Sequence, residues 1–270
     1  MVKALRCGPL AHVFGVVLAV LLLWPVPVAG DTASDEEGTE CFVSSYYRRV
    51  VTVEGFNKIQ MTVTLPTIYR DAYRFMQDGS HIYLGSSYVT PGFRSEVDAG
   101  LAYDVTRNRW GEIDRVNLAW RPFIRTATAY EYAPAEPQYY WYPGEDVTLT
   151  YEIVRPGYVK LTVSGAGKHY EFEPLPSAGM NLEGRQFMKW VVSLDQSGRE
   201  GLGPVPTTYR IEGAHVRDVI LWRPDGTAVP LSEEYVNKPR TCIFPEPSPF
   251  TIQFNVKYAD EVISIAGYTE

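Results

Sequence analysis

Two acidic side chains, Glu96 and Asp98, lie two positions apart in the stretch from Ser95 to Asp104. If this stretch is a β-strand, both carboxylates point to the same face, because strand side chains alternate with a period of two. Neighbouring carboxylates on one face of a sheet can contact water, a cation or the hydroxyl groups of a sugar. We predict that Glu96 and Asp98 bind a ligand through hydrogen bonds to its hydroxyl groups.

A catalytic role for this pair is the alternative. Retaining glycosidases place two carboxylates about 5–5.5 Å apart, and one group of sandwich glycosidases carries them in a Glu-x-Asp-x-x-Glu strand. Here Leu101 stands in place of the second glutamate. A secreted polysaccharide lyase or glycosidase would instead use Glu96, Asp98, His81 or Tyr83 for acid–base work. A third interpretation is a structural protein of the cell envelope or spore.

An aromatic run supplies the strongest binding feature of the sequence. It consists of Tyr139, Tyr140, Trp141 and Tyr142 and is followed by Pro143-Gly144. Flat rings with polar tips suit wet recognition surfaces and stack on sugar rings. We therefore predict a non-catalytic protein that binds a carbohydrate through these rings, although they could also pack at one end of the fold.

Hard oxygen ligands for calcium occur close together at Asp98, Asp104, Asn108, Glu112 and Asp114. Their spacing does not match an EF-hand loop. We predict no cofactor and keep calcium as an alternative. A polysaccharide or a component of the cell envelope is the expected partner.

The chain begins like an exported protein. Lys3 and Arg6 precede an apolar run over residues 10–24, and small residues follow up to Gly30. This pattern predicts a secretory signal peptide over residues 1–30, and the acidic residues 31–40 predict a disordered linker. Removing the signal changes the net charge from −7 to −9, because it takes away two basic residues and no acidic one. Such a surface argues against nucleic acid and anionic membranes as partners, because both are bound mainly through Lys and Arg. We expect a secreted monomer without a membrane span.

Two cysteines remain after the predicted cleavage, Cys41 and Cys242. An exported chain with one such pair predicts a disulfide. The bond would join the first strand region to a late one.

Short alternating segments with frequent turns indicate an all-β fold. Apolar and polar residues alternate over 58–65 and again over 147–153 and 159–163, where Pro156-Gly157 separates the last two segments. Alternation of this kind is typical of half-buried antiparallel strands. We predict an antiparallel β-sandwich of jelly-roll or concanavalin-like type over residues 41–270. A division into two smaller β domains near Gly184 is the alternative.

Three segments resemble a known family. They are Glu96-Val97-Asp98-Ala99-Gly100-Leu101-Ala102-Tyr103, the run from Tyr142 to Tyr151, and the run from Val159 to Gly165. Together they are similar to the YrpD-like group of secreted proteins from Gram-positive bacteria, over roughly residues 82–267. The resemblance implies export and a β-sandwich. It assigns no reaction and no binding residue.

Overall fold

The computed structural model describes residues 41–43, 45–74, 77–107, 111–199, 201–246 and 249–267. All of them belong to one compact unit, Gly38–Glu270. The predicted signal peptide and the predicted linker lie outside the described residues.

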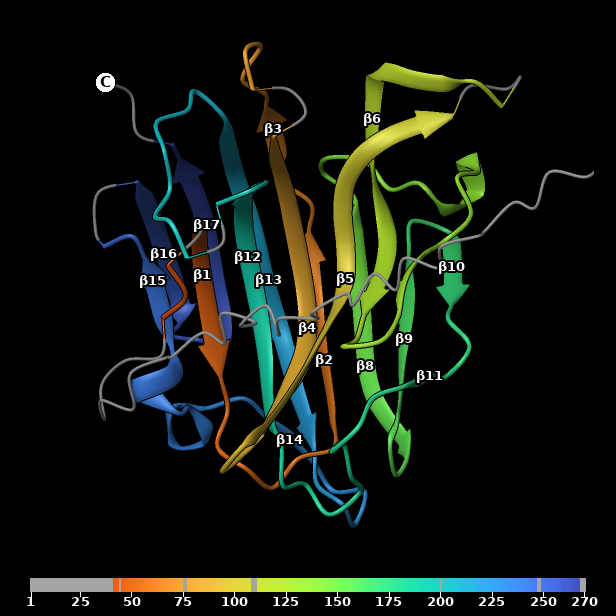
Figure 1. Cartoon of the computed structure of the whole chain (residues 1–270), viewed down its shortest axis with the longest axis vertical. Helices are drawn as coiled ribbons and strands as arrows, with labels where there is room; N and C mark the ends of the chain where they lie inside the picture. Colours follow the sequence, from red (N-terminus) through yellow and green to blue (C-terminus); the bar gives the residue numbers. More distant parts are fainter. Residues whose placement is uncertain are drawn as a thin grey trace, which may run out of the picture. The chain divides into compact units, whose positions relative to one another are not determined.

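A seven-stranded antiparallel sheet carries most of the features that matter for function (Figure 1). Strand β5, drawn in yellow, bends strongly along its length. The spatial order is β15 (Cys242–Phe244), β1 (Tyr46–Val51), β12 (Phe187–Gln196), β4 (Asp78–Thr90), β5 (Phe93–Arg107), β6 (Ile113–Arg125) and β7 (Tyr130–Tyr132).

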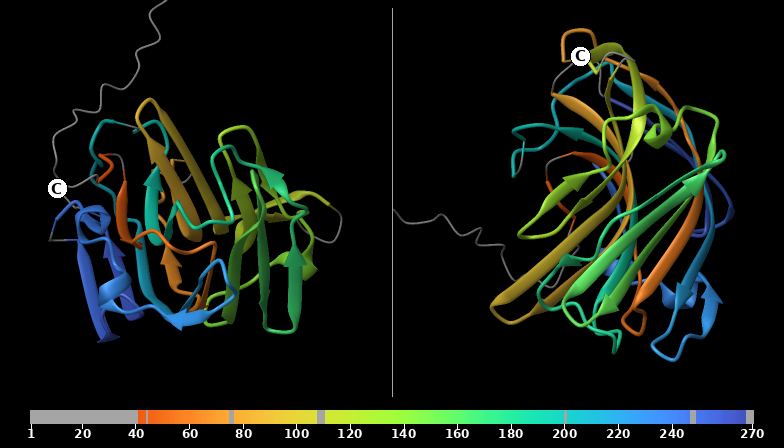
Figure 2. Two further views of the ribbon diagram at one scale, coloured as in Figure 1. Left: turned by 90° about the horizontal axis from the view of Figure 1, so that it is seen from below. Right: turned by 90° about the vertical axis from the view of Figure 1, so that its right-hand side faces the viewer.

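A ten-stranded sheet forms the second layer (Figure 2). Its main order is β10 (Lys168–Glu171), β9 (Tyr158–Gly165), β8 (Asp146–Arg155), β2 (Lys58–Thr64), β13 (Arg210–Trp222), β17 (Asp260–Ala266) and β16 (Phe250–Val256). Strand β11 (Leu175–Pro176) pairs with β9, and β3 (Thr67–Tyr69) and β14 (Ala228–Pro230) pair with β13. Three short 3-10 helices, η1 (Pro137–Tyr139), η2 (Glu233–Tyr235) and η3 (Lys238–Arg240), lie between strands.

The core lies between the two sheets and follows the alternation of the sequence. In β2, Ile59, Met61 and Val63 are fully buried, whereas the residues between them are half-buried. Strands β8 and β9 repeat this pattern and pair as a hairpin. The prediction of an antiparallel β-sandwich is confirmed.

Strands distant in the sequence pair with each other in both sheets. Strand β1 lies between β12 and β15, and β2 lies between β8 and β13. Each sheet therefore needs strands from both halves of the chain.

The predicted disulfide is confirmed. Cys41 and Cys242 are bonded, with their Cα atoms 6.0 Å apart, so residue 41 is tied to the edge strand β15 of the seven-stranded sheet. A disulfide of this kind fits an exported protein. In the described part of the chain, no helix has the length and apolar character that crossing a membrane requires.

Candidate active site on the outer face of the seven-stranded sheet

Four residues on neighbouring strands form one row across the seven-stranded sheet. Lys189 of β12 lies opposite Gly85 of β4, which lies opposite Asp98 of β5, which in turn lies opposite Arg125 of β6. The chain neighbours of these residues are fully buried in the core between the sheets; they include Trp190, Leu84, Ala99 and Ile124. Because strand side chains alternate, the row points to the opposite face, which we call the outer face.

Gly85 allows the two charged ends of this row to meet. A Cβ atom at position 85 would lie 1.9 Å from the carbonyl oxygen of Val97 and 3.1 Å from Cε of Lys189. The missing side chain leaves the space through which Lys189 reaches across β4. Its Nζ atom lies 2.7 Å from Oδ1 of Asp98, two strands away.

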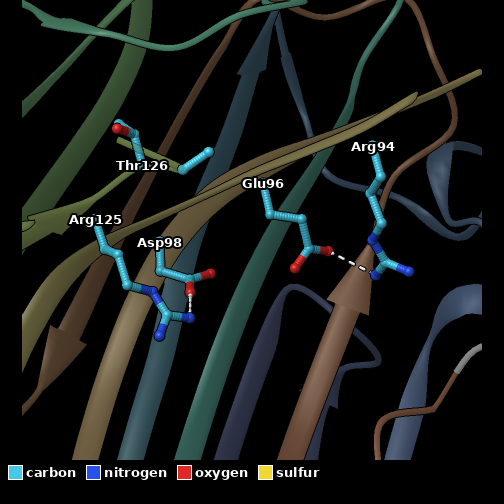
Figure 3. Close-up of a pocket in the computed structure, with 6 residues that line it drawn as sticks. Arg94, Glu96, Asp98, Arg125 and Thr126 are labelled. Carbon is cyan, nitrogen blue, oxygen red and sulfur yellow. Dashed lines mark hydrogen bonds and ion pairs between the residues drawn. The ribbon is translucent and has the colours of Figure 1, made fainter. Parts of the chain in front are cut away.

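The carboxylates predicted from the sequence lie side by side on this face and are held by cations (Figure 3). Glu96 lies 4.0 Å from the Lys189 ammonium and accepts a hydrogen bond of 2.9 Å from Arg94. Asp98 accepts a hydrogen bond from Arg125 on its second oxygen. The Lys189 ammonium therefore lies between two carboxylates, and each carboxylate has its own arginine.

A pocket of about 310 Å³ opens over this arrangement. Its lining consists of Arg94, Glu96, Asp98, Arg125, Thr126 and Ala127. The side chains of Lys189 and Asp98 are only 4% and 7% exposed, whereas the side chain of Glu96 is 27% exposed and that of Arg125 is 59% exposed. The site therefore has a buried ion pair below and an accessible carboxylate and guanidinium above.

Both carboxyl groups are ionised more easily than ordinary ones. Burial alone would raise the pKa of Asp98, but Lys189 and Arg125 outweigh it and hold the pKa below its usual value. Burial also acts to raise the pKa of Glu96, and there Lys189 and Arg94 outweigh burial and the repulsion from Asp98, so that the pKa is lowered. At neutral pH the site therefore holds two carboxylates.

The other predicted acid–base residues lie on the same face. The ring of Tyr83 lies 5.8 Å from the Lys189 ammonium, and burial, followed by the charges of Asp98 and Asp195, raises the pKa of its hydroxyl well above the usual value. Nδ1 of His81 lies 2.7 Å from a carboxylate oxygen of Asp195. Tyr83 thus borders the Asp98–Lys189 pair, whereas His81 has an acidic partner of its own.

The aromatic run lies mostly in the interior. Tyr140 and Trp141 are buried in or beside the core, and the Trp141 indole donates a hydrogen bond to the carbonyl oxygen of Gly165. Tyr139 packs edge-on against Tyr170, and only Tyr142 is exposed. Buried rings cannot stack on a ligand, so the predicted binding role is wrong for Tyr140 and Trp141.

The residues considered for calcium have other partners. Asp98 is paired with Lys189 and Arg125, and Asp104 forms an ion pair with Arg121 at 2.9 Å. Asp114 accepts hydrogen bonds from the backbone and side chain of Asn117. Asn108 lies outside the described residues. Within those residues, no three acidic, histidine or cysteine side chains converge as a metal site would require.

Lys189, Arg125 and Gly85 were not singled out from the sequence. For Lys189 a signal exists, since it is the one charged residue in the apolar strand segment from Phe187 to Val192. A lone lysine in such a segment must find a buried partner. For Arg125 and Gly85 the functional placement follows from strand register, which the local sequence does not reveal.

Three solved structures that are similar to this chain are structures of peptidases. Scytalido-glutamic peptidase with a peptide-based transition-state analogue gives a TM-score of 0.52 at 7% identity, covering 83% of this chain and 99% of that one. The same enzyme with a transition-state analogue inhibitor gives 0.51 at 9% identity, covering 83% and 99%. SCP-B, a member of the eqolisin peptidase family in complex with the tripeptide Ala-Ile-His, gives 0.46 at 9% identity, covering 84% and 100%.

The chain matches no family model and no curated protein. The resemblance to the YrpD-like proteins stays a prediction. The prediction of a non-catalytic carbohydrate-binding protein is contradicted, because two solved structures that share this fold along nearly their whole length, with TM-scores of 0.52 and 0.51, are structures of a peptidase. At this level of identity the likeness concerns the fold, and function has to be argued from the site.

Proposed function

We propose that this protein is a hydrolase that cleaves peptide bonds on the outer face of the seven-stranded sheet. One observation carries the proposal: the Lys189 ammonium lies within 4.0 Å of both Glu96 and Asp98, which line an open pocket. Amide hydrolysis needs a base for water, a cation or donor for the developing oxyanion, and an acid for the departing amine. The pocket offers groups for each of these tasks.

Glu96 is the general base in this proposal. Its side chain is the more exposed of the two carboxylates, and it lines the pocket. Its lowered pKa keeps it ionised into the acid range, so it is ready to accept a proton from a bound water molecule. Asp98 is a positioning residue, because it is buried and holds both Lys189 and Arg125 in place.

Arg125 stabilises the oxyanion. It uses one N–H group on Asp98, its side chain is 59% exposed, and it lines the pocket. A guanidinium has five N–H donors in a fixed plane, so others remain for a substrate oxygen. Lys189 adds positive charge from below, where low solvent exposure strengthens its field.

The proposed reaction balances on these groups alone. Glu96 takes a proton from water while the water oxygen bonds to the carbonyl carbon, and the carbonyl electron pair moves onto the oxygen facing Arg125. The protonated Glu96 then gives its proton to the amide nitrogen as the carbon–nitrogen bond breaks. The products are an amine and a carboxylic acid, and the acid loses its proton to solvent, which leaves Glu96 ionised for the next cycle.

Two further observations support this proposal. The fold is one in which peptidases occur, with TM-scores of 0.52 and 0.51. The disulfide Cys41–Cys242 supports action outside the cell.

The test is digestion of a mixed peptide library by the disulfide-bonded protein, from acid to neutral pH, with products identified by mass spectrometry. Glu96→Gln keeps the shape of the side chain and removes the base. We expect it to lower kcat/KM by about 100-fold or more, the range for loss of a general base. The matched control is Glu171→Gln, because Glu171 is an ion-paired carboxylate on the other sheet, 3.3 Å from Lys160.

A decrease in Glu96→Gln with an unchanged melting temperature, and full activity in Glu171→Gln, would support the assignment. Absence of cleavage by the unmodified protein at every pH would reject a peptidase. Equal rates for Glu96→Gln and the unmodified protein would reject Glu96 as the base.

A further inference from the structure

A second, narrow opening lies beside the pocket and shares Arg94 and Glu96 with it. Its volume is about 10 Å³, against about 310 Å³ for the pocket. A cavity of roughly 10–15 Å³ holds one water molecule when several polar groups surround it. The narrow opening is therefore too small for a substrate side chain and matches a single water molecule.

Three polar groups of different character line this opening. They are the carboxylate of Glu96, the ammonium of Lys189 and the hydroxyl of Ser87. Nζ of Lys189 lies 4.0 Å from Oε1 of Glu96, which is too long for a hydrogen bond and short enough for one water molecule to bridge. Arg94 also donates to Oε1, so among the described residues no donor reaches Oε2 of Glu96. The carboxylate can therefore still accept a proton from water.

Strand register places Ser87 of β4 directly opposite Glu96 of β5. The preceding residue, Ser86, points into the core, where its hydroxyl lies 2.6 Å from that of Tyr151 on the other sheet. Because strand side chains alternate, Ser87 lies on the outer face beside Glu96. Ser87 is only 7% exposed, and its hydroxyl shares no hydrogen bond with any other described residue. A buried hydroxyl of this kind is expected to bind water.

The arginines that line the opening contact other groups. Arg94 donates a hydrogen bond of 2.9 Å to Glu96, and Arg49 donates one of 3.2 Å to the carbonyl oxygen of Arg240. The guanidinium of Arg240 lies 4.2 Å from the ring centre of Phe187. These cations surround the opening with positive charge, which favours a water molecule that gives up a proton.

We infer that the narrow opening binds the water molecule that attacks the peptide bond, and that Ser87 orients it. The water donates one hydrogen to Glu96 and the other to Oγ of Ser87, and it accepts a hydrogen bond from Lys189. One lone pair of its oxygen then remains for the carbonyl carbon of a peptide in the pocket. Because this water is the nucleophile of the same reaction, the inference rests on the proposed function.

The two hydrogens of the water have different fates. The proton on the Glu96 side passes to the carboxylate as the new carbon–oxygen bond forms. The hydrogen on the Ser87 side stays on the oxygen and becomes part of the new hydroxyl group. Ser87 keeps its own proton throughout, so it forms no covalent bond with the substrate.

The first test is structural and does not depend on activity. Crystal structures are determined for the unmodified protein and for Ser87→Val, at a resolution that shows ordered water. We expect one water molecule within hydrogen-bond distance of Glu96, Lys189 and Ser87 in the unmodified protein. We expect none in Ser87→Val, because the methyl groups of valine would fill the opening.

The second test is kinetic. Ser87→Ala should lower kcat by about 10-fold, in the range for loss of one hydrogen bond, and leave KM unchanged, because no contact with the peptide is removed. Ser87→Val should lower kcat further, because it also excludes the water. The matched control is Ser193→Ala, since Ser193 is a buried serine opposite His81 on the same sheet. This variant should keep both constants, and melting temperatures are measured for all three proteins.

The two tests together separate this inference from the proposed function. If the unmodified protein cleaves peptides but shows no ordered water in the opening, the peptidase stands and the inference is overturned. Equal kcat values for Ser87→Ala and the unmodified protein also overturn it. An ordered water without cleavage of any peptide rejects the peptidase and, with it, the role of this water as the nucleophile.

Discussion

Both sheets carry ion pairs across their outer faces, but the two sets differ in burial. On the ten-stranded sheet, Glu152 lies 3.7 Å from Lys58 and 3.1 Å from Lys160, and all three side chains are 20–31% exposed. Further along strands β2 and β8, the hydroxyl oxygens of Thr62 and Thr148 lie 3.4 Å apart. On the seven-stranded sheet, Lys189 and Asp98 are almost fully buried, and arginines flank them.

The difference separates a solvated surface from a candidate site. Exposed ion pairs contribute little to stability, because water competes for both charges. A buried pair has lost its hydration, so removal of one partner leaves an uncompensated charge. Such an arrangement is hard to explain by stability alone, whereas perturbed charges beneath a pocket are typical of functional sites.

The largest expected difference concerns the two lysines. Lys189→Met should lower the free energy of unfolding by about 3 kcal/mol, because Asp98 would lose its nearest cation in a buried setting. Lys160→Met removes a half-buried lysine, 20% exposed, that is paired with Glu152 and Glu171, and should cost less than about 1 kcal/mol. Denaturant titration of both variants measures the difference. Equal losses would show that the two faces are energetically alike.

The next effect concerns the gap through which Lys189 reaches Asp98. Gly85→Ala should cost about 2–3 kcal/mol and reduce peptide cleavage, since the new methyl group would meet the Val97 carbonyl and displace Lys189. Gly79→Ala is the control on the same strand, because its Cβ would find only His81, at 3.8 Å. It should be tolerated within about 1 kcal/mol. Thermal unfolding and cleavage assays are made on both proteins. If the two substitutions prove equally mild, Lys189 does not need the space at position 85 to reach Asp98.

The smallest effect is a change in titration. Glu96 has a lowered pKa, so its ionised form stabilises the fold above the pKa of an unfolded glutamate, and this stabilisation is lost as the pH falls through the lower folded pKa. Arg94→Gln removes one of the cations that lower the pKa of Glu96. The pKa of Glu96 should rise, and the acid limb of the pH–rate profile should move to higher pH. Carbon-13 NMR of the glutamate carboxyl groups measures the pKa of Glu96. An unmoved pKa would exclude Arg94 as a cause.

Much of the fold could be predicted from alternation alone. Ile59, Met61 and Val63 mark one face of a strand, and the turn at Pro156-Gly157 marks a hairpin, because both signals are local. The disulfide between Cys41 and Cys242 followed from having one pair of cysteines. The order of strands within each sheet depends on pairings over long sequence distances, and no local pattern encodes them.

The candidate site could also be predicted only in part, because it too depends on strand pairing. Glu96 and Asp98 were found because they share a strand, whereas Lys189 reaches them only through the pairing of β12, β4 and β5. The binding role predicted for Tyr140 and Trp141 was wrong for a related reason. Rings that suit a sugar also suit a core, and Trp141 is fully buried beside β6, where it pairs with Trp120. Composition cannot separate these two roles, since burial depends on what the rest of the chain covers.

The interleaving of early and late strands has a consequence for how the protein comes into being. Strand β1 can pair only after residues 187–196 and 242–244 have been made. Strand β13 can pair with β17 only after residues 260–266 have been made. A chain emerging from the ribosome cannot complete the seven-stranded sheet before residue 244 has been made, or the ten-stranded sheet before residue 266 has been made. Domains dominated by such distant contacts fold in milliseconds to seconds. The early strands β1 and β2 are therefore made long before all of their partners exist, and both sheets are completed late in synthesis.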